Sequence, residues 1–231
     1  MNKKKNTYYT NMTLKEGQFI ELDYTARITE TDEVFDTTYE DVAEEHGLKE
    51  TKEHSFEPII VCIGEGHIIE GLDQGLIGKE KGEHSFDINP PQAFGKKNPE
   101  LIQIIPEKEF KKQNMTPRPG LEINVDGEYG VIKKTGGGRV VVDFNHPLSG
   151  KEISYNVEVH RVVEDKKEQA ESLLEKIGMP YEDLAVEDKE AKVIVNMDLP
   201  NEFKENLNEE FKRILDINIT VTVQGEEDDE E

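Results

Sequence analysis

The sequence contains no tryptophan and only one cysteine, and basic residues are scarce relative to acidic ones. A single cysteine excludes an internal disulfide, so we expect a reducing compartment and a buried, inert thiol at Cys62. The 28 Lys and Arg against 51 Asp and Glu leave a net charge of −23. This charge excludes nucleic acid bound through a general basic surface, because phosphate contacts need Lys and Arg.

Long apolar runs are also missing, and hydrophobic residues make up only 34% of the 231 residues. No segment approaches the run of about 20 apolar residues that spans a bilayer, so we expect no membrane partner. The N-terminal MNKKKNTYYTNM has a basic cluster without an apolar segment behind it, unlike a signal peptide. We therefore expect a cytoplasmic protein with several small cores, a disordered arm at residues 1–11 and a solvated acidic tail at 226–231.

Common catalytic signals are absent as well. The glycines of TGGGR, residues 135–139, lie between two predicted strands and do not open a helix as a phosphate-binding loop does. The six histidines show neither HxxxH nor HExxH spacing, and no cysteine pair accompanies them. Ligand spacing is the main sequence evidence for a metal, so we expect no metal and no cofactor.

Several segments do show the alternation of half-buried strands. GQFIELDYTARI places five apolar or aromatic residues on one face: Ile20, Leu22, Tyr24, Ala26 and Ile28. FEPIIVCIG, GEHSFDIN and HPLSGKEISYNVEVHRV are also typical of strands, and DVAEEHG predicts a short helix that ends at Gly47.

IIEGLDQGLIG, residues 68–78, predicts a short helix with apolar residues at 68, 69, 72 and 76. Each interior glycine destabilises a helix by about 1 kcal/mol relative to alanine, so the three glycines need a reason. We expect Gly71 and Gly75 to let the sheet pack closely. Gly78 is expected to end the helix as a C-terminal cap.

Two further regions follow. Residues 100–144 predict a small, mostly β unit with a helix in EKEFKKQ whose first position is Pro106, a hairpin turn at Asp126-Gly127 and a turn at TGGG. Residues 165–225 predict the order helix, strand, helix, strand. The second of these helices carries an apolar face that we expect to be core: Phe203, Leu207, Phe211 and Leu215.

The segments LDYTARI, VFDTTY, IIEGLDQGLIG, GEHSFDINPPQAFG and YNVEVHRV, taken together and in this order, resemble the FKBP family of peptidyl-prolyl isomerases. The resemblance covers about residues 12–99 and 145–163. Phe94 and Tyr155 are 61 positions apart, which is longer than an ordinary flap. The segment between them, closed by DFNHPLSGK, is similar to the insert-in-flap domain of SlyD-type members, and the added C-terminal region makes the whole resemble a long-chain archaeal FKBP.

The resemblance implies an α+β fold, with a bent antiparallel sheet around a short helix and an apolar pocket between them. It implies a small, mostly β domain inserted in the flap at 100–144 and an extra C-terminal α/β domain at 165–225. Carried over residue by residue, it assigns catalysis to Tyr24, Asp36, Ile69, Phe94 and Tyr155. It assigns substrate binding to Phe35, Ile59, Val61, Ile68, Leu72 and Leu148.

Two residues depart from the family pattern. Leu72 stands where many members have tryptophan, and Phe94 stands where the usual motif has a tyrosine whose hydroxyl would donate a hydrogen bond. We therefore expect weak binding of macrolide inhibitors without loss of activity. Asp36 is expected to orient polar atoms at the rim, and the alternative is a loop-capping carboxylate.

The function implied is a peptidyl-prolyl cis-trans isomerase that acts on X-Pro bonds of unfolded or folding proteins, with chaperone activity through the insert. The alternative is a holdase or peptide-binding module with little isomerase activity. A SlyD-like nickel chaperone is disfavoured because the tail GEEDDEE lacks His and Cys. Unfolded polypeptides are the expected clients, and we expect a homodimer through the C-terminal domain.

Overall fold

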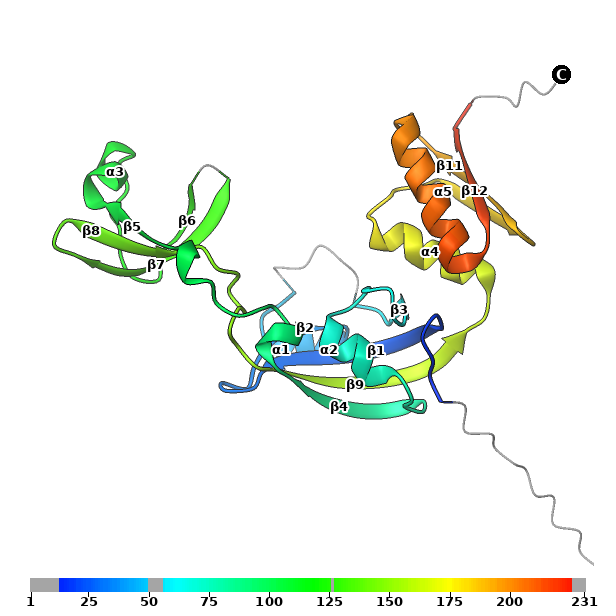
Figure 1. Ribbon diagram of the computed structural model, residues 1–231, viewed down its shortest axis with the longest axis horizontal. Coiled ribbons are helices and arrows are strands. Elements are labelled where there is room, and N and C mark those ends of the chain that lie inside the picture. Colours follow the sequence, from blue (N-terminus) through cyan, green and yellow to red (C-terminus); the bar gives the residue numbers. More distant parts are fainter. Residues whose placement is uncertain (1–12, 50–55, 126, 226–231) are drawn as a thin grey trace, which may run out of the picture. The chain divides into compact units, whose positions relative to one another are not determined.

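The computed structural model describes residues 13–49, 56–125 and 127–225 (Figure 1). The chain divides into two compact units. The first unit comprises residues 1–27, 33–86 and 154–231, and the second comprises 28–32 and 87–153. The expected arm at 1–11 and tail at 226–231, as well as Asp126 of the predicted hairpin, lie outside the described residues. The domain boundaries drawn from the sequence stay predictions.

The first unit is built on a sheet of five strands: β1 (Phe19–Ile28), β2 (Glu33–Thr37), β3 (Ile59–Cys62), β4 (Gly82–Ile88) and β9 (Ile153–Val163). Their order is β2-β1-β9-β4, and β3 pairs antiparallel with β1. The predicted face of β1 is confirmed, because Ile20, Leu22 and Ala26 are fully buried. Mixed helices and antiparallel strand pairs agree with the expected α+β class.

Two short helices belong to this unit, α1 (Glu40–Glu45) and α2 (Glu70–Leu76). α2 packs so closely that a Cβ on Gly75 would lie 2.9 Å from ring atoms of Phe86 on β4. Gly78 has a φ of +79° just after the helix, and its N–H donates to the Leu14 carbonyl. The role expected for Gly75 is confirmed, and that of Gly71 stays a prediction. The positive φ of Gly78 ends the helix direction, but the C-cap residue is Ile77 and the Gly78 N–H bonds no carbonyl of α2, so the expected cap is corrected.

The C-terminal part of the first unit contains α4 (Lys166–Lys176), β10 (Asp183–Glu187), β11 (Glu190–Val195), α5 (Asn201–Leu215) and β12 (Asn218–Val223). β10 pairs antiparallel with β11, and β11 pairs parallel with β12. The expected order of helix, strand, helix, strand was wrong because it omitted β10. That strand is short, and only Leu184 and Val186 supply its inward alternation.

These C-terminal elements share a core with the first sheet. Phe19 of β1 and Cys62 of β3 belong to the same apolar cluster as residues of α4, α5 and β10–β12. Phe211 on α5 is almost completely buried there. Phe203 was expected in this core, but it is 39% exposed, because it lies in the first turn of α5, one turn before the buried stripe begins.

The second unit holds a separate sheet formed by β5 (Ile102–Pro106), β6 (Glu122–Val125), β7 (Glu128–Gly136) and β8 (Arg139–Asp143). The order is β5-β8-β7-β6, and all neighbours are antiparallel. The predicted turn at TGGG is confirmed by the β7-β8 pairing, and β6 pairs with β7 up to Val125 and Glu128 on either side of the predicted hairpin turn. The short helix α3 (Glu107–Lys112) follows β5, and Pro106 is its N-cap rather than its first residue, which corrects the prediction.

This second sheet has a small core of five buried side chains: Phe110, Ile123, Ile132, Val140 and Val142. Two 3₁₀ turns, η1 (Pro90–Gln92) and η2 (Pro99–Leu101), precede it. Across both units, no helix among the described residues is long and apolar enough to cross a membrane.

Candidate active site

Three aromatic rings and one carboxylate from three strands meet in the first unit. Tyr24 on β1 and Tyr155 on β9 have ring centroids 5.6 Å apart, and Phe35 on β2 meets Tyr155 edge-on at 6.5 Å. The Tyr24 hydroxyl donates to Oδ2 of Asp36 at 2.7 Å. The structure therefore brings together four of the eleven residues expected at the site.

The two tyrosines of this cluster stay neutral at ordinary pH. Burial first, and then the charge and hydrogen bond of Asp36, raise the pKa of Tyr24 well above its usual value. Burial and the charge of Asp36 likewise raise the pKa of Tyr155. A neutral phenol donates its proton to a fixed acceptor, so Asp36 holds the ring of Tyr24 in place.

The neighbouring backbone fixes this arrangement. The Tyr24 N–H donates to the Thr38 hydroxyl at 2.9 Å, and the Thr38 N–H returns a bond to the Tyr24 carbonyl at 3.0 Å. These bonds tie the end of β2, and with it Phe35 and Asp36, to β1. The sequence did not predict a role for Thr38. Its position directly after VFDT was the local signal that could have pointed to it.

Five more expected residues lie on β3, the following loop and α2. Val61 and Leu72 are almost completely buried, with Leu72 1% exposed, whereas Ile59, Ile68 and Ile69 are half-buried. Ile69 is the N-cap residue of α2. Half-buried side chains can offer surface to a ligand, and buried ones support it from behind.

A buried carboxylate that sequence reasoning missed shapes the loop before α2. Asp73 accepts from the Gly64 N–H at 2.8 Å and from the Gly66 N–H at 3.3 Å. Asp73 sits one helical turn from Ile69, so these bonds connect the loop to the helix that carries Leu72. A carboxylate inside an otherwise apolar helix stripe was the available sequence signal.

Phe94 and Leu148 belong to the second unit. Phe94 stacks on His146, with centroids 5.0 Å apart and ring planes 2° from parallel. Ser149 donates its hydroxyl proton to the Phe94 carbonyl at 3.0 Å, and the Gly150 N–H donates to the Gly95 carbonyl at 2.8 Å. The segment that carries Leu148 is thus bonded to the loop that carries Phe94, and His146 and Ser149 are partners that sequence reasoning did not find.

A group of polar side chains joins the segment that enters the small sheet to the segment that leaves it. Asn145 accepts from the Asn98 N–H at 2.7 Å and donates its amide protons to the Asn98 carbonyl and to Asp143. Burial opposes ionisation of Asp143, but hydrogen bonds from Asn145 and Lys97 outweigh it and lower the pKa. These hydrogen bonds fix where the chain enters and leaves the sheet of the second unit.

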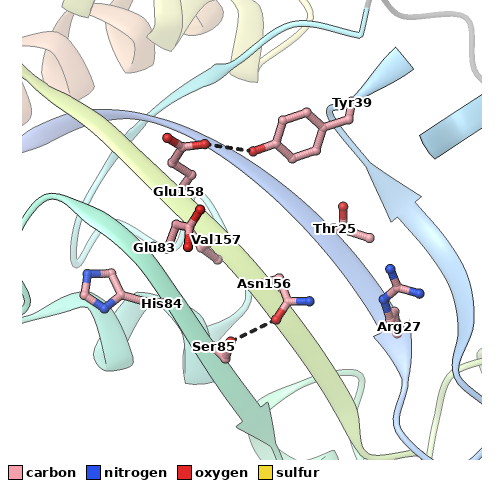
Figure 2. Close-up of a pocket in the computed structure, with 9 residues that line it drawn as sticks. All are labelled: Thr25, Arg27, Tyr39, Glu83, His84, Ser85, Asn156, Val157 and Glu158. Carbon is pink, nitrogen blue, oxygen red and sulfur yellow. Dashed lines mark hydrogen bonds between the residues drawn. The ribbon is translucent and has the colours of Figure 1, made fainter. Parts of the chain in front are cut away.

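A polar hollow of about 290 Å³ lies against β1, β4 and β9 (Figure 2). Alternation along β1 directs Tyr24 to the other side of the strand. Thr25 and Arg27 contribute to it, as alternation along a strand requires. Tyr39 donates to Glu158 at 3.3 Å, and Ser85 donates to Asn156 at 2.9 Å across it (Figure 2). Its charged lining suits a solvated surface and not a proline ring.

Comparisons with known proteins address the same residues. Residues 10–111 match the family model described as FKBP-type peptidyl-prolyl cis-trans isomerase, and residues 103–148 match one described as FKBP26, IF domain. The short-type peptidyl-prolyl cis-trans isomerase of Methanocaldococcus jannaschii is 36% identical over 151 residues, which cover 64% of this chain and 94% of that protein. The chain belongs to the FKBP-type peptidyl-prolyl cis-trans isomerases.

Bacterial FKBP-type isomerases are also similar. The 16 kDa FKBP-type isomerase of Escherichia coli K12 is 34% identical over 116 residues, 48% of this chain and 77% of that protein. SlyD of Aeromonas hydrophila is 30% identical over 134 residues, 52% of this chain and 58% of that protein. The resemblance to archaeal and SlyD-type FKBPs is therefore confirmed, and the protein is a peptidyl-prolyl cis-trans isomerase.

Proposed function

We propose that this FKBP-type isomerase acts on X-Pro bonds of unfolded or folding polypeptides. Catalysis is assigned to Tyr24, Asp36, Ile69, Phe94 and Tyr155. The observation that carries the assignment is the ring of Tyr155 flanked by Tyr24 and Phe35, with Tyr24 held by Asp36. Such a wall of neutral rings is suited to a flat, apolar proline.

The chemistry requires no covalent step. Amide resonance sets a barrier of about 18–20 kcal/mol to rotation of the peptide bond. Water bonded to the carbonyl stabilises the planar, charge-separated form, whereas a dry aromatic surface favours the twisted form in which charge separation is reduced. When a proline ring packs against Tyr24 and Tyr155, its X-Pro amide is removed from water. The twisted amide is then stabilised relative to the planar one.

Substrate binding is assigned to the remaining residues of the expected site: Phe35, Ile59, Val61, Ile68, Leu72 and Leu148. The half-buried Ile59 and Ile68 offer contact area, and the buried Val61 and Leu72 keep the surface behind them rigid. Phe94 lacks the hydroxyl of a tyrosine, which supports weak binding of macrolide inhibitors.

The catalytic part is tested by a prolyl tetrapeptide assay on Asp36→Ala. A hydrogen bond to a charged group contributes about 1.5–3 kcal/mol, so kcat/KM should fall about tenfold to a hundredfold. Tyr24→Phe is the matched control, because it removes the hydroxyl that bonds Asp36 and keeps the ring. If Asp36 acts by holding Tyr24, the double variant should lose little more than either single one. An unchanged kcat/KM in Asp36→Ala would leave Asp36 as a loop-capping carboxylate.

The insert at 100–144 is proposed to hold unfolded clients near the isomerase site. In support, the second unit leaves apolar side chains in solvent: Leu101, Ile102, Ile104 and Tyr129, the last two 63% and 77% exposed. Exposed apolar residues on a sheet suit transient contact with unfolded chains. A holding surface on the same chain as the isomerase site raises the local concentration of substrate. The alternative, a holdase with little isomerase activity, predicts client binding with negligible turnover in the tetrapeptide assay.

The C-terminal region is proposed to form a homodimer. In support, it exposes Ile177, Met197 and Phe203, although many of its other apolar residues pack into the shared core. Truncation at residue 163 would expose Phe19 and Cys62, which pack against the C-terminal elements. Substitution of exposed residues therefore tests the dimer without disturbing this core. Light scattering of Met197→Glu with Phe203→Glu should give the mass of one chain, half that of the unsubstituted dimer, and an unchanged mass would contradict a dimer through these residues.

A further inference from the structure

The loop between β3 and α2 leads directly into Ile68 and Ile69, which the proposed function places at the substrate. Gly64 and Gly66 in this loop have φ values of +89° and +66°. Their N–H groups both bond to Asp73 of α2. The loop is therefore shaped from the isomerase side by a buried carboxylate.

The same loop is held from the other side by the C-terminal helices. Lys176, the last residue of α4, donates to the His67 carbonyl at 2.5 Å. Arg213 on α5 pairs with Glu65 through Nη1 and Oε2 at 2.6 Å. Two cations from two different helices thus contact two loop residues immediately before Ile68.

His67 is also fixed through its ring. Its Nδ1 accepts from the Cys62 N–H at 3.0 Å, and Phe19 meets the ring edge-on at 6.5 Å. Burial first, and then the charge of Lys176, lower the pKa of His67, which keeps Nδ1 available as an acceptor. His67 therefore links β1, β3 and α4 at one point.

β3 itself lies between the two parts of the first unit. Cys62 and Ile60 on one face pack into the core formed by α4, α5 and the C-terminal sheet. Ile59 and Val61 alternate to the other face, which the proposed function assigns to substrate. Displacing the C-terminal elements would therefore move both β3 and the loop that follows it.

We propose that the C-terminal elements position the β3–α2 loop for the substrate, with Lys176 and Arg213 as positioning residues. This inference rests on the proposed placement of Ile68 and Ile69 at the substrate. A loop that is ordered before binding loses less conformational freedom when the peptide arrives, so the C-terminal region acts mainly on affinity. The rotation of the peptide bond is left to the aromatic cluster.

The test is Lys176→Met combined with Arg213→Met in the full-length protein. Methionine keeps an unbranched side chain of similar length and removes the charge. Each of these exposed contacts contributes little by itself, so the two substitutions are combined. In the double variant, KM for a prolyl tetrapeptide should rise about threefold to tenfold, with kcat changed less than about twofold. Amide hydrogen exchange at residues 64–69 should become faster, and the His67 pKa followed by NMR should rise. Lys176→Arg with Arg213 intact should restore KM.

Lys189→Met is the matched control, because it removes the exposed pair of Lys189 with Asp216 in the same region, away from the loop. It should leave KM and the exchange at residues 64–69 unchanged. Unchanged exchange in the double variant would overturn the inference, and so would faster exchange with an unchanged KM. Failure of the proposed site is seen separately, as an unchanged kcat/KM in Asp36→Ala.

Discussion

Residues 100–144 and residues 165–225, which we propose are both additions to the isomerase, are built in opposite ways. The insert has its own small core, leaves apolar side chains exposed and carries seven basic and seven acidic residues. The C-terminal region shares the core of β1 and β3 and carries eight basic and 15 acidic residues. A neutral surface in a protein of net charge −23 is where an unfolded chain meets the least repulsion, whereas a shared core suits a structural role.

The largest expected effect separates the two cores. Phe211→Ala should reduce the free energy of unfolding of the first unit by about 3–5 kcal/mol, because it empties a core that includes Phe19 and Cys62. Phe110→Ala in the five-residue core should destabilise the second sheet alone. Denaturant unfolding, followed together with tetrapeptide activity, checks this. Loss of tetrapeptide activity in Phe110→Ala at low denaturant would contradict the independence of the insert.

Two close glycine contacts sharpen the same comparison. A Cβ on Gly75 would lie 2.9 Å from Phe86, and a Cβ on Gly130 would lie 2.7 Å from Phe144. Overpacking of this kind costs about 1–3 kcal/mol. Gly75→Ala should therefore lower the stability of the first unit and tetrapeptide kcat/KM. Gly130→Ala should lower the stability of the second sheet and client refolding, with tetrapeptide kcat/KM unchanged. Equal losses in tetrapeptide turnover would refute the division of labour.

Deletion of residues 100–144, bridged by a short glycine and serine linker, tests the role of the insert directly. Tetrapeptide turnover should stay within about threefold of the original, because no residue assigned to proline binding is removed. Catalysis of a proline-limited refolding reaction should fall about tenfold or more, since the local concentration of client is lost. Equal losses in both assays would mean that the insert serves the isomerase site itself.

The smallest expected effect concerns Phe94→Tyr, at the ring that stacks on His146. The added hydroxyl can supply a hydrogen bond contributing about 0.5–1.5 kcal/mol, so macrolide affinity should rise by up to about tenfold. Binding is measured by calorimetry, with tetrapeptide activity as the control for folding. No gain in affinity would contradict the position assigned to Phe94.

Local sequence patterns predicted much of the first sheet and the short helix α2. Alternation in GQFIELDYTARI placed Ile20, Leu22 and Ala26 inside, and Gly75 had the packing role expected of it. β10 was missed because its inward pattern rests on Leu184 and Val186 alone. Phe203 was misplaced because helical periodicity gives the direction of a side chain but not where its neighbours end.

Some residues of the candidate site were predicted from the sequence, and others were shown only by the structure. The residue types of Tyr24, Phe35, Asp36 and Tyr155 were found from ordered family segments, and the structure adds the hydrogen bond and ring contacts that join them. Asp73, His67 and the stack of Phe94 on His146 were not foreseen. Asp73 had a sequence signal, a carboxylate inside an otherwise apolar helix stripe, that was not used. The contacts of His67 and His146 have no periodicity that a sequence pattern could detect.

The sequence by itself determined most strands, the glycine-rich helix and the acidic character, because each depends on neighbours within a few residues or on composition, and the order of its segments carried the family resemblance. Only the tertiary structure decided that α4 and α5 contact the loop before Ile68. Those contacts join residues 109 and 148 positions apart, Lys176 with His67 and Arg213 with Glu65. Contacts over such separations depend on how packed elements bring distant side chains together, which no local pattern encodes.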